Sequence, residues 1–147
     1  MKTNVERMRY QTESVSYALC LLGLVANVCY FLHMFRNNSL SQTWVIGVDV
    51  IYNIVFMLIT FLAAENAKRY RLKWSYGIAA IGLLQIVRIF ILPLNYYNSG
   101  QLTQEKFIYA IVYLSASALL LIAGAVVCYI KSDVLLKYLK EIEQNQA

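Results

Sequence analysis

Four long runs of apolar residues constrain the fold of this chain more than any other feature. Each run has about 19 to 24 residues, the length a helix needs to cross a hydrocarbon layer of about 30 Å at 1.5 Å per residue. The runs are 17–35, 44–64, 75–94 and 107–130. The sequence therefore predicts an all-α integral membrane protein in which four transmembrane helices form a bundle.

The composition agrees with a lipid environment. Of the 147 residues, 60% are hydrophobic and 14% are charged, whereas soluble domains carry about 25% charged residues. Four spans leave only the segments 1–16 and 131–147 and short connectors outside the membrane. This remainder is too short for a nucleotide-binding fold or a large catalytic domain.

The basic residues predict the orientation of the spans. Ten of the 13 Lys and Arg residues lie in 1–16, 65–74 and 131–147, and the two opposite connectors contribute only Arg36 and Lys106. Because basic segments stay on the cytoplasmic side, we expect both termini inside (N-in, C-in) in a cell membrane. The net charge of +5 then reflects topology, with the lipid bilayer and not nucleic acid as the partner.

Both cytoplasmic ends have the pattern of short amphipathic helices. The N-terminal segment 1–16 opens with a capping-box pattern at 3–6. The tail 131–147 continues the helical spacing of apolar residues through Leu135, Tyr138, Leu139 and Ile142. Such a stripe needs either the headgroup zone of the membrane or a partner helix, and both alternatives stay open.

Asp49 and Arg88 are charged residues inside predicted spans, where charge is rare and energetically costly. Asp49 is five residues inward from Trp44 and Arg88 is six residues inward from Leu94. Both therefore lie about 7–9 Å below the outer boundary. We expect the two side chains to form an ion pair within the bundle.

A layer of uncharged polar residues is predicted below this pair. Each of the four spans contributes one residue nine positions inward from its outer end, at a depth of about 13–14 Å. These residues are Asn27, Asn53, Gln85 and Ser115. Because lipid cannot form hydrogen bonds with them, they should face one another.

Two interpretations of this layer remain. It is either a clasp of hydrogen bonds that fixes helix register, or the floor of an outward-open cavity for a ligand or ion. The cavity would be lined above the layer by His33, Asp49 and Arg88 together with Tyr109 and Tyr113, which share a helix face. His33 alone is either an interfacial histidine or a proton relay.

Small residues predict where helices approach each other closely. Ala110, Ser117 and Gly124 recur every seven positions in the fourth span, and Gly77 and Gly82 lie in the third. Stripes of small residues are typical of contacts between membrane helices. We interpret them as contacts, not as gates.

The sequence contains no signature of catalysis or cofactor binding. It has no glycine-rich phosphate loop, no metalloprotease motif and no cysteine–histidine cluster, so we expect no cofactor and no metal. We therefore expect a non-catalytic subunit or accessory protein of a larger membrane complex, which associates with other membrane chains or with itself. The alternative is a small oligomeric transporter or channel that uses the polar cluster as its site. A third interpretation is a membrane enzyme with chemistry near His33 and Asp49.

Overall fold

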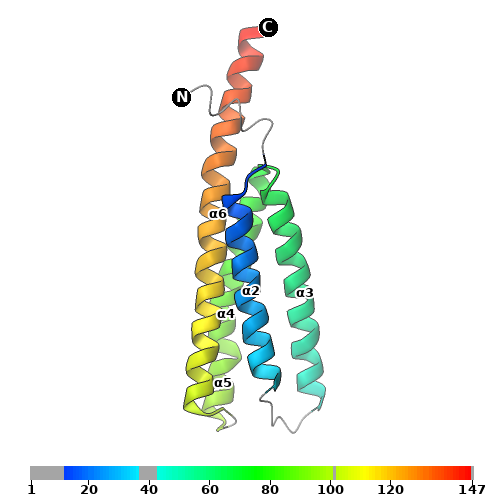
Figure 1. The fold of residues 1–147 in the computed structure, drawn as a ribbon, viewed down its shortest axis with the longest axis vertical. Helices are drawn as coiled ribbons and strands as arrows, with labels where there is room; N and C mark the ends of the chain where they lie inside the picture. Colours follow the sequence, from blue (N-terminus) through cyan, green and yellow to red (C-terminus); the bar gives the residue numbers. More distant parts are fainter. Residues whose placement is uncertain (1–11, 37–42, 101, 147) are drawn as a thin grey trace.

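The computed structural model describes residues 12–36, 43–100 and 102–146, and these ranges are helical apart from short connections. The elements in chain order are α2 (Val15–Arg36), α3 (Thr43–Ala67), α4 (Leu72–Ile91), α5 (Pro93–Asn98) and α6 (Gln104–Gln146). The four long helices run alternately in opposite directions (Figure 1). All four are long and apolar enough to cross a membrane, which confirms the predicted helical architecture.

Several boundaries differ from the predicted ones. The third span was expected at 75–94, but α4 is Leu72–Ile91, and a separate short helix, α5 (Pro93–Asn98), begins before the expected end of the span. Proline is well suited to the first position of a helix because the missing N–H would be unpaired there. The predicted helix within 1–16 lies largely outside the described residues.

The fourth span and the tail form one helix. α6 is 43 residues long, so the predicted division between 107–130 and 131–147 is not visible as a break in the helix. Its C-terminal part continues past the ends of the other helices (Figure 1). The tail is therefore a straight continuation of a span.

α6 is the central helix of the bundle. It packs extensively against α2 and α4, whereas α3 makes much smaller contacts with α2 and α4. The approach is close at Gly82 of α4, where a Cβ atom would lie only 2.8 Å from Ile122 Cγ1 of α6. Of the small residues predicted at helix contacts, Ala110, Ser117 and Gly124 are buried. Gly77 is half-buried, and a Cβ atom there would have Trp74 of its own helix as its nearest neighbour, so it does not mark a close contact.

The surface of the bundle is largely apolar. Large apolar side chains are more than half exposed, among them Ile51, Leu58 and Phe90 at 64%, 59% and 64%. The buried stripe of α3 instead contains polar and small residues, among them Asn53, Thr60 and Ala64. A bundle with apolar residues outside and polar residues inside has the arrangement required in lipid, which supports a multi-pass membrane protein.

Glu13 ties the start of α2 to α6 and to the connection between α3 and α4. Its carboxylate accepts hydrogen bonds from the N–H groups of Val15 and Ser16, the first residues of α2, and pairs with Lys131 of α6. Its own N–H donates to the carbonyl of Lys68 at 3.0 Å. A buried acid at a helix N-terminus satisfies N–H groups that would otherwise lack partners.

Tyr70 lies in the connection between α3 and α4, close to this cluster. Its backbone has a positive φ of 53°, and its N–H donates to the carbonyl of Ala67. Partial burial, followed by the nearby Glu13 carboxylate, raises the pKa of Tyr70. Its hydroxyl therefore stays protonated at neutral pH.

Candidate functional site

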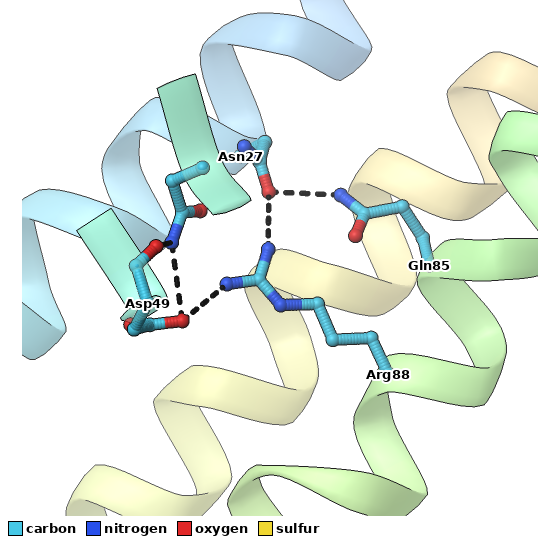
Figure 2. Close-up of polar contacts among 5 residues, drawn as sticks. Asn27, Asp49, Gln85 and Arg88 are labelled. Carbon is cyan, nitrogen blue, oxygen red and sulfur yellow. Dashed lines mark hydrogen bonds and ion pairs between the residues drawn. The ribbon is translucent and has the colours of Figure 1, made fainter. Parts of the chain in front are cut away.

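An ion pair joins α3 and α4 inside the bundle. Arg88 Nη2 lies 3.1 Å from Asp49 Oδ1 (Figure 2), with 2% of the Arg88 side chain and 26% of the Asp49 side chain exposed. The structure therefore confirms the predicted pairing of these two charges. Pairing reduces the cost of placing either charge in a low-dielectric environment.

Two tyrosine rings enclose the guanidinium of Arg88. Its Cζ atom lies 4.7 Å from the ring centroid of Tyr30 on α2 and 4.7 Å from that of Tyr52 on α3. Aromatic faces attract a cation, and the attraction increases when the cation is removed from water. Neither tyrosine was singled out from the sequence, although each lies three residues after a polar residue on the same helix face, Asn27 and Asp49 respectively.

Asn27 of α2 links the ion pair to the polar layer. Its Oδ1 accepts hydrogen bonds from Gln85 Nε2 at 2.8 Å and from Arg88 Nη1 at 3.3 Å (Figure 2). Gln85 Nε2 also lies 3.1 Å from Ser117 Oγ, and that hydroxyl donates to the Gly23 carbonyl at 2.8 Å. These contacts connect α2, α4 and α6 through side chains that are almost fully buried.

Asn53 completes the layer from α3. Its Nδ2 donates to the backbone carbonyl of Asp49 at 2.7 Å and to Asp49 Oδ1 at 3.3 Å. Asp49 therefore accepts from Arg88 and Asn53 with the same oxygen. All four long helices are thus joined by one network, which we call the polar clasp: Asn27, Asp49, Asn53, Gln85, Arg88 and Ser117.

Ser115 is not part of the polar clasp, and this corrects the prediction. The serine that reaches Gln85 is Ser117, which is fully buried, whereas Ser115 is half-buried. The prediction counted depth along the span, but two residues of an α-helix also differ by about 200° in direction. The small-residue stripe that contains Ser117 marked the correct face.

His33 and Tyr113 belong to a separate aromatic group. The ring of His33 lies 5.3 Å from that of Tyr109 and 6.3 Å from that of Tyr113, centroid to centroid. The hydrogen bonds described above for the polar clasp come from other residues, and the predicted cavity lined jointly by His33, Asp49 and Arg88 stays a prediction. His33 therefore packs against aromatic rings of α6 near the C-terminal end of α2.

A groove lies between α3 and α4 on the outside of the bundle and reaches the ion pair. It has a volume of about 500 Å³. Its walls are apolar, its floor includes Asp49 and Arg88, and Tyr96 of α5 lines one end. Its wall residues are partly exposed, including Val48 at 53% and Val87 at 50%. The groove therefore opens sideways from the bundle.

Comparison with known proteins assigns no family or function to the chain. The chain matches no known protein family, no curated protein and no solved structure. Within the described ranges, no group of three or more His, Cys, Asp or Glu side chains could hold a metal ion.

Proposed function

We propose that the protein is a non-catalytic subunit or accessory protein of a larger complex in the cell membrane. In this role the polar clasp holds the four helices in register and the surfaces of the bundle contact other membrane chains. Interhelical hydrogen bonds in membranes contribute about 0.6–2 kcal/mol each, enough to specify one arrangement. A chain of contacts supports a structural role for these side chains. Asp49 pairs with Arg88, Arg88 and Gln85 both donate to Asn27, and Gln85 also contacts Ser117.

The extension of α6 is the single observation that carries this proposal. The helix continues beyond Lys131, whose partner Glu13 precedes the first residue of α2. Ser132 is buried and Leu135, Leu139 and Ile142 are half-buried, at the three- and four-residue spacing of a helix-packing seam. The packing face of α6 thus continues beyond the first residues of α2 and α4. We propose that a partner chain packs against this part of α6.

The test is purification of the tagged full chain from its native membrane in a mild detergent. We expect other membrane chains in fixed stoichiometry, and we expect the double variant Leu135→Glu/Leu139→Glu to lose them. Leu136→Glu, at a position that is 40% exposed, is the matched control and should keep them. Recovery of the wild-type chain alone, with solute flux after reconstitution, would contradict the proposal.

We propose the N-in, C-in orientation for the same protein. Ser99 follows α5 and Gln144 lies in the last turn of α6, and both are exposed. α5 and the C-terminal end of α6 lie at opposite ends of the bundle (Figure 1). With Cys29→Ser as background, a membrane-impermeant maleimide should label Ser99→Cys in intact cells and Gln144→Cys only after permeabilisation. Labelling in the reverse pattern would show that the basic segments are outside, against the positive-inside rule.

The groove favours a second candidate function, a small oligomeric transporter or channel. The groove opens on the side of the bundle and is lined by Asp49, a quarter of whose side chain is exposed. If the ion pair is a transport site, Asp49→Asn should abolish flux in vesicles while expression stays normal. Loss of expression or stability instead would favour the clasp.

A further inference from the structure

The groove between α3 and α4 has the dimensions of a ligand site. Its volume of about 500 Å³ falls in the range of about 300–1,000 Å³ that is usual for small-molecule pockets. Along α4 it runs from Leu84 to Leu92, and Tyr96 of α5 lines its far end. Eight residues of helix correspond to about 12 Å, which is short for a docked helix and suits a small molecule.

The aliphatic side chains that line the groove favour a ligand with a large apolar part. Val48, Leu84, Val87 and Ile91 present aliphatic side chains that are about half exposed, at 53%, 54%, 50% and 54%. In a membrane these side chains meet acyl chains, so a ligand can enter from the side without crossing a polar barrier. The occupant is therefore soluble in the membrane.

Asp49 and Arg88 determine which polar group of a ligand the groove can bind. Arg88 and Asn53 both donate to Asp49 Oδ1, and neither contact uses Oδ2. The carboxylate, partly exposed at the groove, can therefore accept a hydrogen bond from a ligand. A ligand cation is not needed, because Arg88 already balances the charge of Asp49.

Charge complementarity excludes strongly charged head groups. The ion pair is neutral as a unit, so an anionic or cationic ligand would introduce an uncompensated charge at this depth. An uncharged hydroxyl donates a hydrogen bond and adds no charge. We propose that the groove between α3 and α4 binds a neutral, hydroxyl-bearing amphiphile, with its hydroxyl donating to Asp49 and its apolar body along α4.

The experiment uses the purified full chain in phosphatidylcholine vesicles and a photoreactive long-chain alcohol, beside the carboxylic acid and the primary amine of the same chain length. We expect saturable labelling of α3 and α4 by the alcohol, with competition by unlabelled dodecanol. The acid and the amine should label at least about tenfold less, because each would bring an uncompensated charge to this depth.

A matched pair of variants locates the site. Leu84→Trp fills the groove from its wall, whereas Leu83→Trp places the same bulk on a neighbouring position outside it; the two leucines are 54% and 58% exposed. We expect Leu84→Trp to lose the saturable labelling and Leu83→Trp to retain it. Equal labelling of both variants, or labelling that does not saturate, would overturn the proposal.

A third variant tests the role of the carboxylate. Asp49→Asn leaves the charge of Arg88 unbalanced, so the carboxylic acid probe should now label more strongly than the alcohol. An unchanged order of probes in folded Asp49→Asn would show that Asp49 does not select the head group. The labelling is measured on the purified chain alone, so its failure would not bear on the proposed subunit role. Failure to co-purify a partner chain would likewise not bear on this ligand site.

Discussion

At the scale of single residues, direction around the helix decides which polar groups meet. Ser117 and Ser115 occupy the same helix within one turn, yet only Ser117 contacts Gln85 and the Gly23 carbonyl. Within an α-helix the Gly23 carbonyl is the acceptor for the N–H four residues later, and Ser117 adds a second hydrogen bond to it that ties α6 to α2. A polar side chain thus contributes to the bundle only if it faces the interior.

We predict that Ser117→Ala destabilises the bundle by about 1–4 kcal/mol, because it removes both hydrogen bonds of that hydroxyl. Ser115→Ala is the matched control and should change the free energy of unfolding by a few tenths of a kcal/mol at most. Both values can be measured by steric trapping in bicelles. Equal losses for the two variants would mean that the hydroxyl of Ser117 is not an interhelical contact.

At the scale of helices, contact with α6 depends on small side chains and on the terminal tie at Glu13. Gly82 lets α4 approach α6, since an added Cβ would meet Ile122 Cγ1 at 2.8 Å. Gly77, on the same helix, has its nearest neighbour, Trp74 Cε3, at 3.7 Å from such a Cβ. The two glycines therefore have different roles, although the sequence pattern alone treats them alike.

We predict that Gly82→Ala separates α4 from α6 and costs about 1–3 kcal/mol, the usual range for overpacking. Gly77→Ala should cause no loss, because the added methyl group has space and alanine favours helix. Thermal unfolding in detergent, followed by circular dichroism, compares the two variants. A Gly82→Ala protein as stable as the wild type would contradict the close approach of these helices.

We also predict that Glu13→Ala frees the start of α2. The variant removes the carboxylate that accepts from Val15 and Ser16, and the loss of such a cap costs about 1–2 kcal/mol. Hydrogen exchange at the first turn of α2 should accelerate, whereas Glu141→Ala, at an exposed position of α6, should leave it unchanged. Unchanged exchange in Glu13→Ala would show that the cap does not hold this turn.

At the scale of the whole molecule, apolar length was enough to predict the helical bundle, and position along the spans was enough to predict the pairing of Asp49 with Arg88. Both follow from the rise of 1.5 Å per residue. The sequence did not predict the tyrosines around Arg88, the choice of Ser117 or the Glu13 cap. These depend on helix rotation and on contacts between distant segments, which residue spacing within one helix does not determine.

We infer that the pairing of Asp49 with Arg88 holds the four helices of the bundle together. The most direct test is a double-mutant cycle on the free energy of unfolding, measured by steric trapping in bicelles, with Arg88→Met, Asp49→Asn and the double variant. Removing one partner leaves the other charge buried, so we predict that Arg88→Met alone costs about 3–5 kcal/mol and the double variant clearly less. Additive losses, with the double variant as unstable as the sum of the single ones, would contradict the claim.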